Sequence, residues 1–251
     1  MIHLKNAEQL KLMKIAGRIT GEALLVAENA VKAGISTWEL DRIIRAHIEK
    51  CGAKPTFLGY GGFPGSACIS INEEVIHGIP SKKRILCEGD IVKIDVGACY
   101  RGYNGDSART FPVGKISETA QKLIDVTKQS FFEAMKVALP ANRIGDIGST
   151  IQGFVEGAGY SVVRKYVGHG VGAELHEDPE VPNFGVKGRG ARIYSGMTLA
   201  VEPMVNEGTP DVRVLDDGWT VVTADGKLSA HYEHSIAITE DGPILLTDVK
   251  Q

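Results

Sequence analysis

The feature that most restricts the fold of this 251-residue chain is a pattern that occurs once in each half. In the first half, Ser36 and Glu39 have the spacing of a capping box that starts an amphipathic helix, and Gly52 ends it. The same order of apolar residues returns before Gly159. Sliding one half onto the other aligns Leu40 with Ile147, Ile44 with Ile151, and Ile48 with Val155. Because any two amphipathic helices share this periodicity, the pattern predicts an internal duplication without proving it.

A longer helix is predicted before each of these two. Asn6 and Gln9 form another capping box, and the helix that they start is predicted to end near Ala33-Gly34. In the second half, a helix over 117–139 stops at a proline, and the shorter helix of the repeat covers 143–157. Two helix pairs are therefore expected, one in each half.

The segments between and after the helices are rich in β-branched residues and are separated by Gly, Asp and Pro, which is typical of strands. We predict strands at Ile91–Tyr100, Gly105–Val113, Ser161–Val167, Thr198–Val205, Trp219–Thr223 and His234–Thr239. Helices in blocks beside antiparallel strands indicate an α+β fold. No Ser-, Gly- or Pro-rich linker divides the chain, so we predict one domain, 1–251, with related halves of approximately 1–113 and 114–251.

Composition excludes several classes of protein. A net charge of −3 argues against a nucleic-acid binder held by general electrostatics. The sequence has no apolar run long enough to span a bilayer, and the charged residues near its start do not fit a signal peptide. The cysteines form no CxxC pair, so free thiols in a reducing compartment are expected, with a disulfide as the alternative. We therefore predict a cytoplasmic protein without a membrane partner.

Two carboxylates lie in a predicted hairpin. If the chain turns at Tyr100-Arg101, Asp95 lies opposite Asp106, with Cβ atoms roughly 4.5–5.5 Å apart on one face. Two carboxylates this close in an apolar setting lose hydration at a cost of several kcal/mol per ion, which a cation between them would offset. The alternative is that one Asp lies at the surface or that each pairs with Arg101 or Arg109.

Three further residues add to this pair. His169 lies between two glycines that leave room for a close approach, and Glu202 and Glu233 adjoin apolar strands although Glu is almost never fully buried unpaired. With Asp95 and Asp106 they form a set of hard oxygen donors and one imidazole, which suits Mn²⁺, Fe²⁺, Co²⁺ or Zn²⁺. Each residue alone has a structural explanation. Together they predict a metal site, and shared carboxylates could hold two ions about 3.5–4 Å apart.

Seven motifs contain these residues and occur in a specific order and spacing. They are Asn72-Glu-Glu-Val-Ile-His77-Gly-Ile-Pro, Ile94-Asp95-Val, Gly105-Asp106, Gly168-His169-Gly-Val-Gly, Leu175-His176-Glu, Met197-Thr-Leu-Ala-Val-Glu202-Pro203-Met and Glu233-His234. Over nearly the whole chain they resemble the motifs of methionine aminopeptidases, in the short bacterial type I form. The resemblance implies the pita-bread fold of creatinases and aminopeptidases, in which an antiparallel sheet is flanked by two pseudo-symmetric helix pairs. It also implies removal of the initiator methionine from new proteins when the second residue is small.

The resemblance further implies two divalent ions per chain, which would be Co, Mn, Fe, Ni or Zn. One ion would be held by residues at Asp106, His169, Glu202 and Glu233. The other would be held at Asp95, Asp106 and Glu233, so that Asp106 and Glu233 bridge the two ions.

Catalytic roles are implied in the same way. Glu202 would be the general base that accepts a proton from water, and His77 and His176 would polarise the scissile carbonyl from outside the metal shell. Taken singly, each of these histidines is better explained as a hydrogen-bonded loop residue. The ions themselves would lower the proton affinity of a bound water.

A pocket for the methionine side chain is implied as well. Its lining would be Phe57, Tyr60, Phe63, Cys68, His77, His176 and Trp219. Without the resemblance, the loop 60–63 is only a Gly-rich segment with aromatic residues that pack. Phe57 stands where Cys is common in bacterial members, Leu175 where Phe is common, and Lys93 where Asn is frequent near a monovalent-cation site. The presence of a monovalent-cation site and the fine substrate preference are therefore both left open by the sequence.

Three other functions remain as alternatives. A proline-specific peptidase of the same fold usually carries a further N-terminal domain, and a non-catalytic protein-binding platform of this fold has lost metal ligands that are all present here. A metal-binding regulator would bind metal without turnover. Type II methionine enzymes have an insertion between the ligands at His169 and Glu202 that this sequence lacks. The expected partners are the N-termini of nascent polypeptides, met at the ribosome if the protein contacts it. No specific nucleic acid is expected to bind, and the protein is expected to be a monomer.

Overall fold

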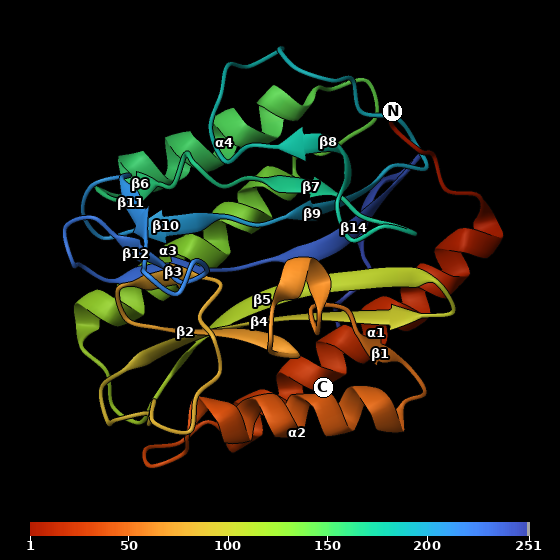
Figure 1. Cartoon of the computed structure of the whole chain (residues 1–251). Coiled ribbons are helices and arrows are strands. Elements are labelled where there is room, and N and C mark those ends of the chain that lie inside the picture. Colours follow the sequence, from red (N-terminus) through yellow and green to blue (C-terminus); the bar gives the residue numbers. More distant parts are fainter. Residues whose placement is uncertain (250–251) are drawn as a thin grey trace.

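The computed structural model describes residues 1–249, and in it two helix pairs enclose the strands (Figure 1). The first pair is α1 (Ala7–Ala30) and α2 (Thr37–Lys50), and the second is α3 (Glu118–Met135) and α4 (Ile144–Gly157). The predicted α+β pita-bread arrangement is confirmed. None of the helices in the described part is long and apolar enough to cross a membrane.

The strands form four small antiparallel sheets rather than one uninterrupted sheet. The first contains β1 (Lys54–Pro55), β2 (Ala67–Ile71), β4 (Ile91–Tyr100) and β5 (Tyr103–Pro112). The second contains β6 (Ser161–Val162), β10 (Met204–Asn206) and β13 (Ser229–His231), and the third β3 (Glu74–Ile76), β11 (Val212–Val214) and β12 (Val221–Thr223). The fourth contains β7 (Gly168–Gly170), β8 (Glu177–Val181), β9 (Thr198–Val201), β14 (His234–Thr239) and β15 (Gly242–Leu245).

Both predicted capping boxes are present. The side chains of Asn6 and Ser36 accept hydrogen bonds from the backbone three residues on, and the side chains of Gln9 and Glu39 accept from the cap residues in return. The first helix was predicted to end near Ala33-Gly34. It ends three residues before Ala33, at Ala30, because Val31 adopts an extended backbone.

The third helix was predicted to reach Leu139, and this is wrong. It ends at Met135, and the Asn142 side-chain amide donates to the Val137 carbonyl at 2.9 Å, which satisfies an acceptor that a longer helix would use. Pro140 also disfavours helical backbone at the residue before it.

The repeat seen in the sequence continues into the strands. The alignment of the two halves pairs six apolar residues of α2 and α4, and all six are fully buried. The same offset carries the Lys54–Cys99 pair of β1 and β4 onto the Ser161–Asn206 pair of β6 and β10. The two halves therefore share strand register as well as helix order, although the boundary near residue 113 stays a prediction.

The register predicted for the hairpin is wrong by two residues. Asp95 pairs with Ala108, and Asp106 pairs with Gly97. The chain turns at Arg101 and Gly102, which both have positive φ (49° and 82°), as the two central residues of a type I′ turn require. Because the slip is even, both aspartates still project from the same face of the sheet.

Three other predicted strands are shorter or broken. The strand expected over 161–167 covers only Ser161–Val162, and the one expected over 219–223 begins at Val221. The strand expected over 198–205 is interrupted at Glu202-Pro203, where it divides into β9 and β10. Pro203 has no N–H to donate to a strand ladder, which explains the break. The break lies beside Glu202, a predicted metal ligand.

Each helix pair covers its own apolar core. One cluster contains Ile19 of α1, Ile44 of α2 and Ile94 of β4, and the other contains Phe131 of α3, Ile151 of α4 and strand residues of the second half. Between the two cores, β5 of the first half meets β14 of the second, where the Asp106 amide donates to the Ser235 hydroxyl. The four cysteines are free thiols, as predicted.

Candidate active site

Four carboxylates and one imidazole converge where the two halves meet. Asp95 lies on β4 and Asp106 on β5, while Glu202 follows β9 and Glu233 precedes β14. The Glu233 amide donates to the carbonyl of Ala108 at 2.9 Å, which joins the hairpin of the first half to the strands of the second. His169 comes from β7, next to β9 in the same sheet. The structure thus brings together all five residues predicted as metal ligands.

The distances in this cluster suit metal binding. One ligand atom from each of Asp106, His169 and Glu233 lies within 4.8 Å of the others. His169 Nε2 lies 3.7 Å from Asp106 Oδ2 and 3.5 Å from Glu202 Oε1. These separations are those of donor atoms around a shared ion, and they require no rearrangement of the backbone.

The hydrogen bond of His169 selects the tautomer that a metal needs. Its Nδ1 lies 2.8 Å from the carbonyl oxygen of Gly170, so Nδ1 carries the proton and donates. Burial lowers the pKa of His169 to about 4, so the ring is neutral near pH 7. The Nε2 lone pair therefore faces the carboxylates, as in a metal-ligating imidazole held by a backbone carbonyl.

The carboxylates are in electrostatic conflict without a cation. Burial raises the pKa of Asp106 to about 7. Burial, and then the neighbouring carboxylates, raise the pKa values of Asp95, Glu202 and Glu233 well above their usual range. Like charges cannot all ionise in so small a space, so this cluster retains protons unless a cation replaces them.

Unpartnered oxygens show that the residues fit a metal. Asp95 Oδ1, Asp106 Oδ1 and Glu233 Oε1 are buried and accept no hydrogen bond from residues 1–249. Buried acceptors of this kind are costly unless something supplies positive charge or a donor. Hard oxygen donors with one imidazole match a divalent transition metal.

A cavity of about 210 Å³ opens onto the carboxylates. It is smaller than the roughly 300–1,000 Å³ of pockets for drug-sized ligands, so it suits a single side chain. All predicted pocket residues line it, namely Phe57, Tyr60, Phe63, Cys68, His77, His176 and Trp219. A larger cavity of about 740 Å³ shares His169 and His176 with it but includes none of the four carboxylates, so the chemistry belongs to the smaller one.

The pocket wall is aromatic and uncharged. Phe63 meets Trp219 edge to face with ring centroids 5.1 Å apart, and His77 meets Tyr166 in the same way at 5.8 Å. Burial raises the pKa of the Cys68 thiol, so it stays neutral. Tyr166, Val167 and Ile76 also line the cavity and were not predicted, because they come from short strands and loops without a sequence pattern.

The two outer histidines lie at different depths. Burial lowers the pKa of His77 to about 4, so this ring is neutral near pH 7. His176 is exposed at the cavity, with its Nδ1 2.7 Å from the Tyr60 hydroxyl and its ring centroid 4.3 Å from that of His169. Both rings line the cavity without belonging to the tight cluster of metal donors.

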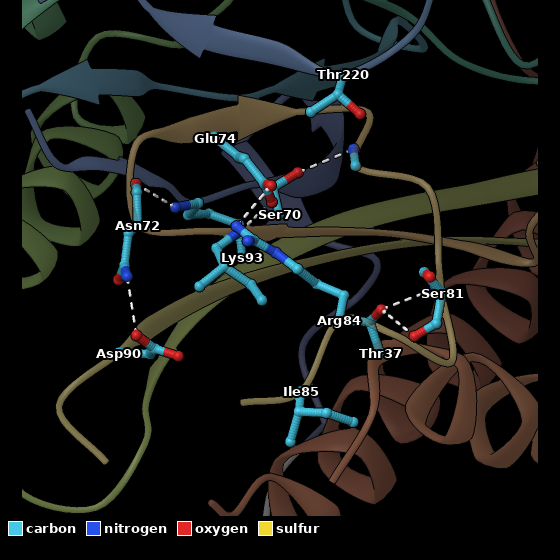
Figure 2. A network of polar contacts seen from close by, with 12 residues as sticks. Thr37, Ser70, Asn72, Glu74, Ser81, Arg84, Ile85, Asp90, Lys93 and Thr220 are labelled. Atoms are coloured by element: carbon cyan, nitrogen blue, oxygen red, sulfur yellow. Dashed lines mark hydrogen bonds and ion pairs between the residues drawn. The ribbon is translucent and has the colours of Figure 1, made fainter. Parts of the chain in front are cut away.

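A network of polar contacts around the buried Lys93 fixes the strand that leads to His77 (Figure 2). Lys93, fully buried on β4, donates from Nζ to the carbonyl of Asn72 at 2.7 Å. The Asn72 side chain donates to Asp90 at 2.8 Å, and Glu74 accepts from Arg84 at 2.8 Å. These contacts tie the segment before His77 to the strand that carries Asp95.

Comparison with known proteins assigns the family. The sequence matches the description of metallopeptidase family M24 over residues 11–240. It is 56% identical to a methionine aminopeptidase of Clostridium acetobutylicum over 98% of this chain and 99% of that one. The chain belongs to the methionine aminopeptidases of metallopeptidase family M24. A crystal structure of methionine aminopeptidase from Thermotoga maritima is similar with a TM-score of 0.98 and 45% identity, covering 99% of this chain and 100% of that one.

Membership of family M24 makes the chain a metal-dependent hydrolase. A prolidase from Pyrococcus furiosus is also similar, with a TM-score of 0.79, but it is only 22% identical and this chain covers 66% of it. That likeness shows the shared fold and nothing about proline specificity. The divalent metal that the family uses fits the carboxylate cluster.

His231 is a residue beside this cluster that the sequence analysis missed. It is 1% exposed, and its Nε2 lies 3.8 Å from Glu202 Oε2. Neither ring nitrogen has a hydrogen-bond partner within the described residues. The sequence signal was its position two residues before Glu233, although β13 ends at His231 and Glu233 lies in the break before β14. His169 lies beside Glu202 Oε1 and His231 beside Oε2, so we expect His231 to orient the Glu202 carboxylate.

Replacing His231 tests this role. We expect His231→Leu to weaken the binding of divalent metal by about 10–100-fold, as losing a partner of a ligand does. His231→Gln keeps an N–H donor and is expected to stay within a few-fold of the unchanged protein. Calorimetric titration of Mn²⁺ into metal-stripped protein measures both. Equal losses in the two variants would mean that His231 only fills space.

Proposed function

We propose that this enzyme hydrolytically removes the N-terminal methionine of polypeptides whose second residue is small. The observation that carries the proposal is the small aromatic cavity that ends at the carboxylate cluster. When the side chain of a substrate's N-terminal residue fills the cavity, the peptide bond that follows this residue lies at the carboxylate cluster. The methionine aminopeptidase names of relatives with full-length similarity support the same substrate.

The cluster would hold two divalent ions. Asp106, His169, Glu202 and Glu233 would surround one, and Asp95, Asp106 and Glu233 the other. Co, Mn, Fe, Ni and Zn all suit this mixture of oxygen donors and imidazole. When bound, the ions would supply positive charge that polarises the scissile carbonyl and lowers the proton affinity of water.

The protein's own groups would handle the protons. Glu202 lies at the edge of the cluster and is only partly buried, so it can accept a proton from water and return it to the leaving amine. Neutral His77 can donate a hydrogen bond to the carbonyl oxygen, and His176 can do so with its ring oriented by Tyr60.

The pocket would select methionine by shape and polarity. One apolar cluster surrounds the cavity and consists of Phe57, Phe63, Cys68, Leu175 and Trp219. An unbranched thioether adapts to such a space and makes favourable contacts between sulfur and aromatic rings. A charged side chain would find no partner on these walls and would be excluded by desolvation.

The natural substrates would be nascent polypeptide N-termini in the cytoplasm, met at the ribosome, with the enzyme acting as a monomer. A net charge of −3 agrees with a protein that binds no specific nucleic acid.

Release of free methionine from the tripeptide Met-Ala-Ser, by metal-stripped protein titrated with Mn²⁺ or Co²⁺, tests the proposal. We expect metal-dependent cleavage of Met-Ala-Ser and at least about 100-fold slower cleavage of Met-Lys and Ala-Pro peptides, equivalent to about 2.7 kcal/mol. Preferred cleavage of Ala-Pro would move the chain to the proline-specific peptidases. Metal binding without any turnover would favour a binding platform or regulator.

A further inference from the structure

A second group of metal-binding side chains lies on the first helix pair, away from the carboxylate cluster. Glu22 projects from α1, and His47 and Cys51 from the end of α2. Helices α1 and α2 lie side by side (Figure 1), and one ligand atom from each of these residues lies within 4.8 Å of the others. None of the three lines the active-site cavity.

The distances match those around a tetrahedral ion. His47 Nε2 lies 3.6 Å from Cys51 Sγ and 3.6 Å from Glu22 Oε2. Bonds of about 2.0–2.1 Å to nitrogen and oxygen and about 2.3 Å to sulfur, at tetrahedral angles, place such donor pairs roughly 3.4–3.6 Å apart. The three donors are therefore already spaced for one ion without movement of either helix.

The local structure holds the donors in this arrangement. His47 and Cys51 are four residues apart, and Cys51 caps α2 with near-helical φ of −77°, so both side chains share one helix face. Arg18 Nε lies 3.6 Å from the other carboxylate oxygen of Glu22, which leaves Oε2 directed at His47. A single imidazole N–H cannot donate to the thiol and the carboxylate at once, whereas an ion satisfies all three groups.

We propose that Glu22, His47 and Cys51 bind a borderline-soft divalent ion such as Zn²⁺, which joins α1 to α2. One thiolate, one imidazole and one carboxylate are the donor types that zinc selects. All three side chains are partly exposed, so the ion can enter from solvent and keeps a fourth position for water. Because the ion binds both helices at once, it stabilises the packing of the first helix pair.

Cobalt absorption tests the site independently of peptidase activity, because the carboxylate cluster contains no thiolate. We expect Co²⁺ added to metal-stripped protein to produce the near-ultraviolet sulfur-to-cobalt charge-transfer band. The band should be lost in Cys51→Ser and retained in Cys99→Ser, which removes a thiol of similar, partial exposure. Cys68→Ser should also retain it, which excludes the thiol that lines the active-site cavity.

Zinc stoichiometry provides a second readout. In competition with a chromophoric chelator, the unchanged protein should bind one more Zn²⁺ per chain than Cys51→Ser. Glu22→Gln should lower the affinity for that Zn²⁺ but keep the cobalt band. Zn²⁺ should also raise the melting temperature of Cys99→Ser more than that of Cys51→Ser. Absence of the band, or a band that persists in Cys51→Ser, would overturn the proposal whether or not the peptidase activity is found.

Discussion

Asp106→Asn is expected to lower metal-dependent peptidase activity by about 10³-fold or more and, in the metal-free protein, to raise the melting temperature. The loss of activity corresponds to about 4 kcal/mol of transition-state stabilisation. Asp106 is 4% exposed, and after burial its charge contributes most to the raised pKa values of Asp95, Glu202 and Glu233. Its replacement by a neutral amide would remove a proposed metal ligand and, at the same time, the charge that contributes most to repulsion in the cluster.

The two opposite effects distinguish a metal site from an ordinary buried polar group. Removing one member of a structural network destabilises a protein, because its partner is left unsatisfied. Removing one charge from a cluster of like charges stabilises it when no cation is bound. Activity on Met-Ala-Ser and calorimetric melting with and without Mn²⁺ measure both effects. Asp211→Asn, at an exposed position, is the matched control.

Two results would contradict this account of Asp106. Metal-dependent turnover within about tenfold of the unchanged protein would show that Asp106 is not an essential ligand, since tenfold is only 1.36 kcal/mol. A lower melting temperature for the metal-free variant would show that Asp106 supports the fold by contacts other than those with a cation.

The hairpin shows how far sequence reasoning reaches. Cross-strand pairing about an assumed turn placed Asp95 and Asp106 on one face, and this is confirmed although the register was wrong, because a slip of two residues preserves the face. The register itself depends on which residues adopt positive φ. Gly102 at the second turn position is the local signal for the observed turn, and a turn at Tyr100-Arg101 leaves that glycine outside it.

The carboxylates of the cluster were predictable for a different reason from the pocket residues. Acidic residues within apolar strands conflict with their surroundings, and this conflict is visible in a single sequence. Phe57 and Tyr60 come from one short segment and Trp219 from another far along the chain, so these side chains line one cavity only in the folded structure. Only resemblance to a family could place them together. His231 fell between the two cases, because a buried histidine has no conflict visible in its sequence neighbours.

The break at Glu202-Pro203 shows where local rules and function meet. Propensity predicts one strand over this stretch, whereas the proline divides it and leaves Glu202 outside both ladders. A residue outside a ladder can turn towards the cluster from the end of β9. Departures from local regularity are expected at functional sites, and this one is of that kind.

The metal-free protein is expected to lose stability as the pH rises from about 6.5 to 8. Burial raises the pKa of Asp106 to about 7 and holds those of Glu202 and Glu233 well above their usual range. In the unfolded chain these groups release their protons near pH 4. The folded state thus binds more protons than the unfolded state in this window, so stability falls as pH increases.

Other buried groups act in the opposite direction and define the window. Burial lowers the pKa values of His77 and His169 to about 4, and their contribution rises with pH only up to the ordinary histidine value of about 6.5. Burial also lowers the pKa of Lys93 to about 7, so above pH 7 this one residue opposes the carboxyl groups. Lys93→Met removes that opposition and should make the decline with pH steeper.

Differential scanning calorimetry of chelator-treated protein between pH 6.5 and 8 measures the decline. Within its window each retained proton changes stability by about 1.4 kcal/mol per pH unit, and a domain of this size shifts by about 2–4 °C per kcal/mol. Divalent metal displaces these protons, so Mn²⁺ should stabilise the protein more at pH 8 than at pH 6.5. A metal-free melting temperature that stays constant or rises across the window would mean that the cluster is ionised without a cation, and the electrostatic basis for metal binding would then be wrong.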